Sequence, residues 1–238
     1  MEYGSAVSES FDYAKDALWA KWTRWILFII SSIIFPLMMG YTVRVLRGEK
    51  PAPELKDWGT MFVDGLKYFA IGLIYAIPLF IVVILSFMPM VSVIAAESPM
   101  LAQSGQVAPY MSAAMTNAIA TMMIGIVVIL ILGIIIAIFE LMGLVRFARM
   151  NSMKEAFNFS AILEHIGKIG WGTYILALIV YFFLSLIYGC IIAVLQMVVP
   201  VLGWIVLIVT IPLWIIFVAR YLVHVYECAI PATPAPVI

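Results

Sequence analysis

Residues 169–219 read IGWGTYILALIVYFFLSLIYGCIIAVLQMVVPVLGWIVLIVTIPLWIIFVA, 51 residues without a single charged side chain. A charge at the centre of a bilayer costs about 3 kcal/mol even on the mildest insertion scales, so such a run is typical of chain that lies in lipid. A helix needs about 20 apolar residues to cross the hydrocarbon, which means that this run fits two crossings. Pro200 and Gly203 mark the turn between them. The sequence therefore predicts transmembrane helices over 171–199 and 202–223.

The charged residues of the chain are confined to four short islands. Apart from Glu97, every Asp, Glu, Lys and Arg lies in residues 2–24, 44–67, 140–168 or 220–227. The chain is 66% hydrophobic and 11% charged, with a mean hydropathy of +1.15, whereas soluble domains are about half apolar and a quarter charged. This composition excludes an ordinary soluble domain, and a formal net charge of zero gives no reason to expect nucleic acid as a partner. We expect an all-α integral membrane protein with one membrane domain over residues 1–238.

A second membrane hairpin is predicted between the second and third islands. This interval is long enough for two further spans, over 68–93 and 117–145. The loop between the two spans, which contains Pro99 and Gly105, is expected on the far side of the membrane. An even number of crossings returns the chain to the side it left, so the second, third and fourth islands are predicted to share one face.

The face shared by these three islands is predicted to be cytoplasmic. The far-side loops hold no cation, whereas the islands hold ten of the thirteen in the chain, namely Arg44, Arg47, Lys50, Lys56, Lys67, Arg146, Arg149, Lys154, Lys168 and Arg220. Cytoplasmic loops carry an excess of Lys and Arg. We therefore expect a multi-pass protein of the cell (plasma) membrane, with the basic islands and the C-terminal tail at 226–238 in the cytoplasm.

Residues 25–43 leave two topologies open. Their length suits a single span, which would give four full spans plus a fifth and would put the N-terminus outside. That arrangement places Lys15, Lys21 and Arg24 on the outside, against the charge pattern. The alternative is a re-entrant pair of short helices with a bend near Pro36, which enters and leaves on the cytoplasmic side. Length favours the span and charge favours the re-entrant pair, to which we lean.

Three segments are predicted to be amphipathic interfacial helices, here called elbows. In residues 5–24, 54–67 and 152–168 apolar side chains recur at helical spacing, and charges occupy the opposite face. Such helices lie in the headgroup plane. Asn151 and Ser152, with Glu155 three residues on, fit a capping box at the start of the third elbow. The first two hairpins end on a common Val-Arg-x-x-Arg pattern, at 43–47 and 145–149, so elbow, hairpin and arginine exit form a repeat.

One region resembles a known family. Residues 40–49 read GYTVRVLRGE, and they are followed by Pro53, Leu55, Asp57-Trp58 and the sequence FVDGLK at 62–67. This pattern is similar to the hallmark of a mostly archaeal membrane family, domain of unknown function 4013, and a looser resemblance extends over most of the chain. The resemblance implies a multi-pass helical topology. It implies no activity and supplies no catalytic residues.

Few residues are candidates for chemistry. Glu140 lies about six residues deeper than Arg146, or about 9 Å of helix, so its carboxylate must be paired, protonated or in a polar cavity. It is interpreted either as a proton-coupling or cation site or as the acidic partner of a structural ion pair with Arg44 or another arginine at the cytoplasmic end. The four exit arginines are candidate contacts for lipid headgroups or other anions, namely Arg44, Arg47, Arg146 and Arg149. His165 and His224 are expected at solvated positions and not as metal ligands, and no cofactor is expected.

These observations favour a non-catalytic function. No catalytic motif is present and the spans hold almost no ionisable groups, so we expect no enzyme. The interpretation is a membrane scaffold or accessory subunit that organises lipid or a membrane complex, with membrane lipids and further subunits or a second copy of the chain as partners. The alternative is a transporter or channel for a small apolar or lipid-like solute, with Glu140 as coupling group and with Asn117, Ser185 and Gln196 as lining.

Overall fold

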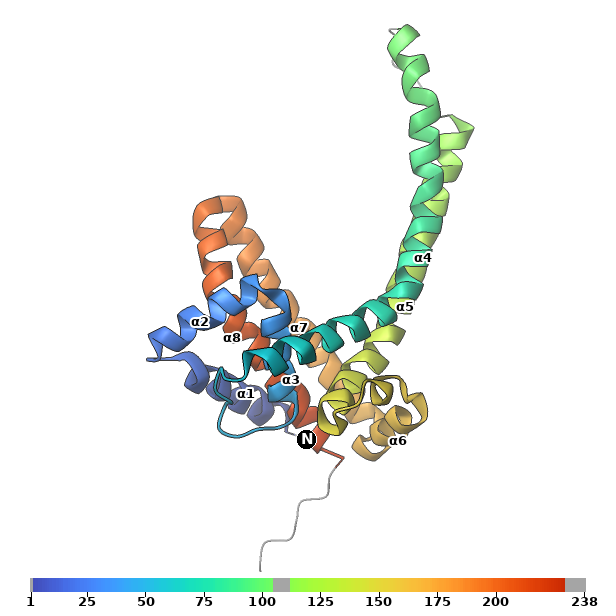
Figure 1. The fold of residues 1–238 in the computed structure, drawn as a ribbon. Helices are drawn as coiled ribbons and strands as arrows, with labels where there is room; N and C mark the ends of the chain where they lie inside the picture. The colour runs from blue at the N-terminus through green and yellow to red at the C-terminus, as the bar shows by residue number, and fades with distance from the viewer. Residues whose placement is uncertain (1, 105–111, 230–238) are drawn as a thin grey trace, which may run out of the picture. The chain divides into compact units, whose positions relative to one another are not determined.

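The computed structural model describes the backbone of residues 2–104 and 112–229, and the side chains of 2–96 and 112–229. Over this range every regular element is helical, which confirms the all-α prediction (Figure 1). The elements are α1 (Tyr3–Leu18), α2 (Trp22–Ile33), α3 (Phe35–Leu46), α4 (Trp58–Ser104), α5 (Ala113–Met150), the 3-10 helix η1 (Met153–Phe157), α6 (Phe159–Ile169), α7 (Trp171–Val198) and α8 (Pro200–Glu227). Gly105 and the tail beyond residue 229 lie outside the described residues.

The chain forms two compact units. The first comprises Met1–Ile71 and Phe139–Ile238, and the second comprises Gly72–Ile138. In the second unit α4 and α5 approach closely, because a Cβ added to Gly125 would lie 1.9 Å from the Ser86 Oγ. Small residues that let helix backbones approach are common between membrane helices.

Four helices are long and apolar enough to cross a membrane, as predicted. These candidate spans are Trp58–Ala96, Ala113–Met150, Trp171–Val198 and Pro200–Glu227. In their most apolar windows only 6% to 22% of the residues are buried inside the protein. So many exposed apolar side chains would be costly in water, whereas lipid gives them an apolar environment. The molecule is therefore a membrane-spanning helical protein.

The second elbow and the span after it form one continuous helix. The segment before Trp58 is not helical, and α4 then runs without a break through the predicted span at 68–93 and on to Ser104. Asp57 has a φ of +51°, which marks the turn into the helix. Gly65 continues the helix instead of breaking it, and its missing side chain serves packing: a Cβ there would lie 1.7 Å from the Pro36 carbonyl oxygen.

Residues 25–43 form a bent helix pair and not a straight span. The axes of α2 and α3 differ by 118° across the break at Ile34, next to the predicted bend. Both ends of the pair contact one short segment. Arg24 near the start of α2 donates to the Pro53 carbonyl at 2.5 Å, and Arg44 near the end of α3 donates to the Glu54 carbonyl at 3.3 Å. The bend rules out one straight span, and the re-entrant course, after which we name α2 and α3 the re-entrant pair, stays a prediction.

The first and third elbows are each interrupted. Helix α1 ends at Leu18, and α2 begins at Trp22 after a short turn. In the third elbow, η1 and α6 are separated by Asn158, whose side chain accepts a hydrogen bond from the Ala161 amide at 3.3 Å. The predicted capping box is wrong, because Ser152 makes no capping hydrogen bond and Glu155 pairs with an arginine instead. The cap thus lies six residues later than the sequence pattern indicated.

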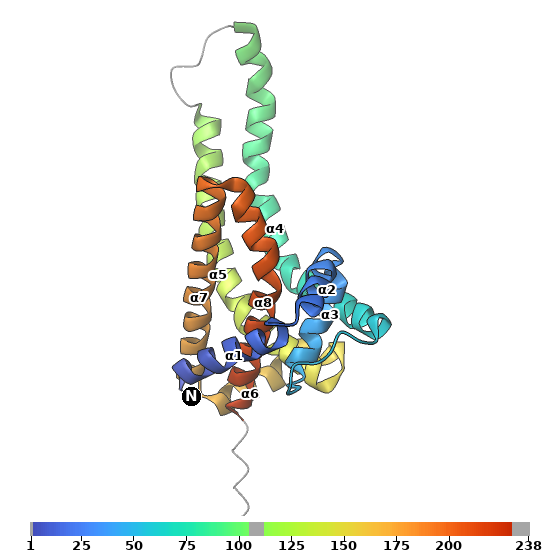
Figure 2. The same cartoon turned by 90° about the vertical axis from the view of Figure 1, so that its left-hand side faces the viewer.

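The core of the first unit surrounds the last turns of α8. There Tyr221, Val223 and Val225 are fully or almost fully buried. Helix α1 packs across α8 with its small residues, and Figure 2 shows this crossing at the end where α8 finishes. The Trp25 indole donates to the Val209 carbonyl at 2.9 Å, which fastens the re-entrant pair to α8. This packing brings the ends of α3, α5 and α8 together.

Candidate functional site

The second, third and fourth charged islands meet at one end of the first unit. The Arg47 Nη2 donates to the Asp64 Oδ2 at 2.6 Å and to the Asn151 Oδ1 at 3.4 Å. The Arg149 Nη2 donates to the Glu227 Oε1 at 2.6 Å, and its Nε donates to the Leu46 carbonyl at 3.1 Å. We call this region, made of the last turns of α3, α5 and α8 and the first turns of α4, the basic end.

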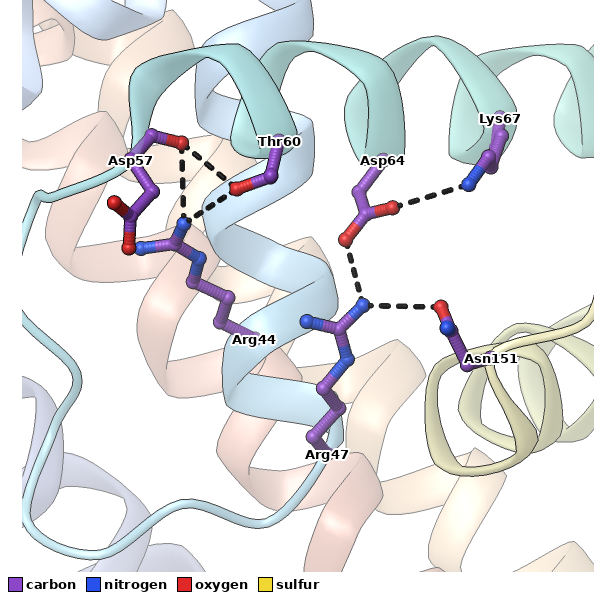
Figure 3. A network of polar contacts seen from close by, with 7 residues as sticks. All are labelled: Arg44, Arg47, Asp57, Thr60, Asp64, Lys67 and Asn151. Carbon is purple, nitrogen blue, oxygen red and sulfur yellow. Dashed lines mark hydrogen bonds and ion pairs between the residues drawn. The ribbon is translucent and has the colours of Figure 1, made fainter.

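A polar pocket of about 510 Å³ opens at the basic end. Figure 3 shows most of its lining, which comes from α3, the start of α4 and the residue that follows α5. The pocket holds three cations and three carboxylates. Its lining residues are Arg44, Arg47, Glu49, Asp57, Thr60, Asp64, Lys67 and Asn151.

The two arginines of the pocket have different kinds of partner. Arg47 is neutralised by Asp64, and the other oxygen of Asp64 faces the Lys67 ammonium at 3.4 Å. The Arg44 guanidinium instead donates to neutral oxygens, at 3.3 Å to the Asp57 carbonyl and at 3.2 Å to the Thr60 hydroxyl (Figure 3). Within the described part of the chain Arg44 forms no ion pair. No carboxylate of the described residues therefore lies within ion-pair distance of its guanidinium.

The first turns of α4 present two different faces. Thr60, Asp64 and Lys67 follow one another at helical spacing and line the pocket. Trp58 and Phe62 belong to the other face and are exposed. This is the amphipathic pattern of a helix at a membrane interface, where the exposed aromatic side chains contact the upper acyl chains.

The other two candidate arginines lie outside the pocket. Arg146 donates through Nε and Nη2 to the Glu155 Oε2, at 2.9 and 2.5 Å. These hydrogen bonds lower the pKa of Glu155. Arg149 bonds Glu227, and its guanidinium carbon lies 5.6 Å from the centre of the Tyr226 ring. The four exit arginines thus do not form one site, since only Arg44 and Arg47 line the pocket.

Glu140 has no arginine partner. Of its two interpretations, the ion pair with Arg44 or another arginine is not formed: across the described residues no hydrogen bond or ion pair joins Glu140 to an arginine. Its half-buried side chain interacts electrostatically with Tyr68. Tyr68 in turn lines an apolar cavity of the first unit. Of the other residues proposed as solute lining, Asn117 belongs to the second unit, and Ser185 and Gln196 do not line this cavity.

Both histidines are half-buried and contact other residues, whereas solvated positions were predicted. The His165 ring stacks on Tyr226 at 3.8 Å between centroids, and its Nε2 lies 2.9 Å from the Tyr226 carbonyl oxygen. The His224 Nε2 lies 3.7 Å from the Glu9 Oε2. Burial lowers the pKa of His165. Over the described ranges no group of three or more His, Cys, Asp or Glu side chains could hold a metal ion.

Apart from Arg44 and Arg47, the six other residues of the pocket lining were not identified as site residues from the sequence. Thr60, Asp64 and Lys67 have a sequence signal, because their spacing puts them on one helix face opposite the aromatic residues. Asn151 gives no such signal. It lies one residue beyond α5 with a φ of +51°, and only the folded chain brings it to Arg47.

The fold and the basic end define a multi-pass, all-helical membrane protein with a polar pocket at one end of its first unit. The chain belongs to the family described as protein of unknown function DUF4013, whose model matches residues 25–197. The match covers all the pocket residues. It also covers, in whole or in part, the seven helical elements from α2 to α7, which include the re-entrant pair. No curated protein and no solved structure matches the chain.

Proposed function

We propose that this protein is a non-catalytic membrane scaffold that binds the headgroup of an anionic phospholipid in the polar pocket. The observation that carries the proposal is the state of Arg44. Its guanidinium lines the pocket but contacts only carbonyl and hydroxyl oxygens. A lipid phosphate offers the charged, two-oxygen partner that a guanidinium prefers, and such charge-assisted bonds are about twice as strong as neutral ones.

The neighbouring charges support a headgroup as ligand. Lys67 adds a second cation, and it is only weakly held by Asp64 at 3.4 Å. Glu49 and Asp57 also line the pocket and offer acceptors for the hydroxyl or amino groups that extend from a lipid phosphate. The mixed set of charges suits a phosphate with a polar substituent better than it suits a bare anion.

The surroundings of the pocket support a position at headgroup depth. The polar face of α4 lines the pocket, while Trp58, Phe62 and Leu66 are exposed on the same turns. A lipid whose phosphate lies at Arg44 can therefore lay its acyl chains along this apolar face. The basic islands are proposed to lie in the cytoplasm of a cell membrane, and the pocket would then face the inner leaflet, where anionic lipids gather.

The way in which the pocket is held supports the scaffold role. Arg47 joins α3 to α4 and to the end of α5, and Arg149 joins α3 to α8. Because these bonds fix the walls of the pocket, little conformational entropy is lost when a headgroup binds. A rigid headgroup site on an interfacial platform can order lipid beside a second copy of the chain or another membrane subunit.

Native mass spectrometry of the protein in mild detergent tests this proposal. After reconstitution with an anionic phospholipid and re-extraction, the wild type is expected to keep one bound lipid, and Arg44→Gln to keep about tenfold less. Lys168→Gln is the matched control, because Lys168 pairs with Glu164 and does not line the pocket. Equal lipid retention by Arg44→Gln and the wild type would contradict the headgroup site.

A second candidate function is supported by one observation. Glu140 has no arginine partner and interacts with Tyr68 at the edge of an apolar cavity, which favours a transporter in which Glu140 couples solute to protons. Proteoliposomes that contain a pH-sensitive dye would then acidify or alkalinise on addition of the lipophilic cation tetraphenylphosphonium, and Glu140→Gln would abolish the response. No response from the wild type would count against transport of such a solute.

A further inference from the structure

The apolar cavity of the first unit is separate from the polar pocket. It has a volume of about 330 Å³ and lies between the re-entrant pair, the start of α4, and α7 and α8. Its walls are mostly apolar, with Phe35, Met38, Trp214 and Leu222 among them, and Arg44 does not take part. The volume lies within the range of natural ligand sites. It has room for roughly ten groups the size of a water molecule, at about 30 Å³ each.

Two of the polar groups in the cavity are already satisfied. The Ser32 hydroxyl donates to the Phe28 carbonyl at 2.8 Å, and the Thr42 hydroxyl donates to the Met38 carbonyl at 3.0 Å. Both are bonds within a helix, and they leave these hydroxyls little capacity as donors to a ligand.

The two tyrosines of the cavity differ from the Ser32 and Thr42 hydroxyls in their hydrogen bonding. Tyr68 from α4 and Tyr181 from α7 both line it, and neither phenol has a hydrogen-bond partner among the side chains and backbone groups that the structure describes. They lie close enough to interact electrostatically with each other, and Tyr68 does so with Glu140 as well. Because phenols at an apolar site normally find a hydrogen-bond partner, this pair forms a polar corner that a ligand can complete.

The chemistry of this corner selects the ligand. Two phenol groups donate hydrogen bonds, so the ligand needs an acceptor oxygen. The Glu140 carboxylate, which interacts electrostatically with Tyr68 but does not line the cavity, disfavours an anionic head. A neutral hydroxyl satisfies both demands, and the walls around it require a hydrocarbon body.

We propose that this cavity binds a neutral long-chain alcohol or a lipid that ends in one, with its hydroxyl between Tyr68 and Tyr181 and its chain along Met38 and Trp214. The proposal goes beyond headgroup binding at Arg44 and does not rest on it. It holds whether or not the bound molecule crosses the membrane.

Photolabelling of the full chain in nanodiscs tests the site. The probe is decanol that carries a diazirine, and the labelled residues are mapped by mass spectrometry. In the wild type we expect saturable labelling of the cavity walls, at residues such as Met38 and Trp214. Tyr68→Phe and Tyr181→Phe are each expected to reduce labelling at these residues about fivefold, the effect of one lost hydrogen bond.

Three further comparisons serve as controls for this experiment. Tyr188→Phe is the matched control, because its hydroxyl lies 3.0 Å from the Thr210 hydroxyl and does not line this cavity, so labelling should persist. Val218→Phe puts a ring into the cavity and should abolish labelling even where the tyrosine variants fold poorly. Diazirine-labelled decanoate should label the cavity weakly, and more strongly in Glu140→Gln. Labelling that ignores both tyrosines and Val218→Phe, or decanoate that labels as well as decanol, would overturn the proposal.

Discussion

At the scale of single residues, Asp64 is the centre of the polar pocket. Its two oxygens face Arg47 at 2.6 Å and Lys67 at 3.4 Å, and its side chain is only 12% exposed. An acidic residue that serves two cations at a partly buried place contributes more than a surface ion pair, because its removal leaves a guanidinium without a charged partner.

Asp64→Asn is therefore expected to destabilise the protein by about 2 kcal/mol. The measurement is the melting temperature of the purified protein in detergent. Glu54→Gln is the control, since the pair of Glu54 with Lys56 is largely exposed and should leave the melting temperature unchanged. Equal melting temperatures for Asp64→Asn and wild type would show that the pocket network does not stabilise the basic end.

His165 gives the protein a pH dependence. Burial, with smaller contributions from nearby cations, lowers its pKa in the folded protein below the ordinary value of 6.5. The unfolded chain therefore binds a proton more readily than the folded one, so the free energy of unfolding falls as the pH decreases through 6.5 and levels off below the folded pKa. Melting temperatures between pH 7.5 and 5 should show this decline. His165→Gln should flatten it, and an unchanged slope in that variant would assign the decline to other groups.

At the scale of helices, the spans were predictable and their ends were not. The four apolar helices follow from charge-free runs of sufficient length, because the bilayer imposes that length from outside the protein. The cap of α6 at Asn158 and the continuous course of α4 depend on tertiary contacts instead. Ser152 and Glu155 match a capping box in sequence, yet Arg146 lies close enough to take Glu155.

The same limit applies to the candidate site. The sequence identified Arg44 and Arg47 from the exit pattern, and both line the pocket. It could not distinguish them from Arg146, because all four arginines share the same pattern and differ only in the carboxylate that folding supplies. The unpaired state of Glu140 likewise could not be predicted from the sequence, because it depends on which helix ends meet in the folded chain.

The crossing of α3 and α4 depends on two glycines. A Cβ at Gly40 would lie 1.7 Å from the Met61 carbonyl oxygen, and one at Gly65 equally close to that of Pro36. Gly40→Ala and Gly65→Ala are each expected to cost about 1 to 3 kcal/mol, because backbone atoms must move apart. Size-exclusion chromatography and melting temperature report this loss. Gly59→Ala is the control, with open space around it. It should be neutral or stabilising, as alanine is the better helix former, and similar behaviour of all three variants would refute the close crossing.

At the scale of the whole molecule, the proposed orientation can be tested with one thiol. Cys228 is exposed just beyond α8, and burial of part of the side chain raises its pKa, so labelling is best done at pH 8. In a Cys190→Ser background, a membrane-impermeant maleimide should label Cys228 only after cell lysis.

A second variant supplies the control for orientation. Gln106→Cys, with Cys190 and Cys228 replaced by serine, places the thiol in the stretch that the sequence predicts on the far side. It should react in intact cells. Labelling of Cys228 in intact cells with protection of the residue 106 thiol would reverse the topology.

The docking of the N-terminal helices onto α8 sets an order for biosynthesis. The indole of Trp25 bonds a carbonyl 184 residues later, and the buried face of α1 packs on the same helix. At about 5 to 20 residues per second, a ribosome takes roughly 10 to 40 seconds to make the intervening chain. Throughout that interval these early helices lack the surface of α8 on which they finally pack. Until α8 is made, their apolar faces can be buried at the membrane interface. Assembly of the first unit thus finishes only when the last span has left the insertion machinery.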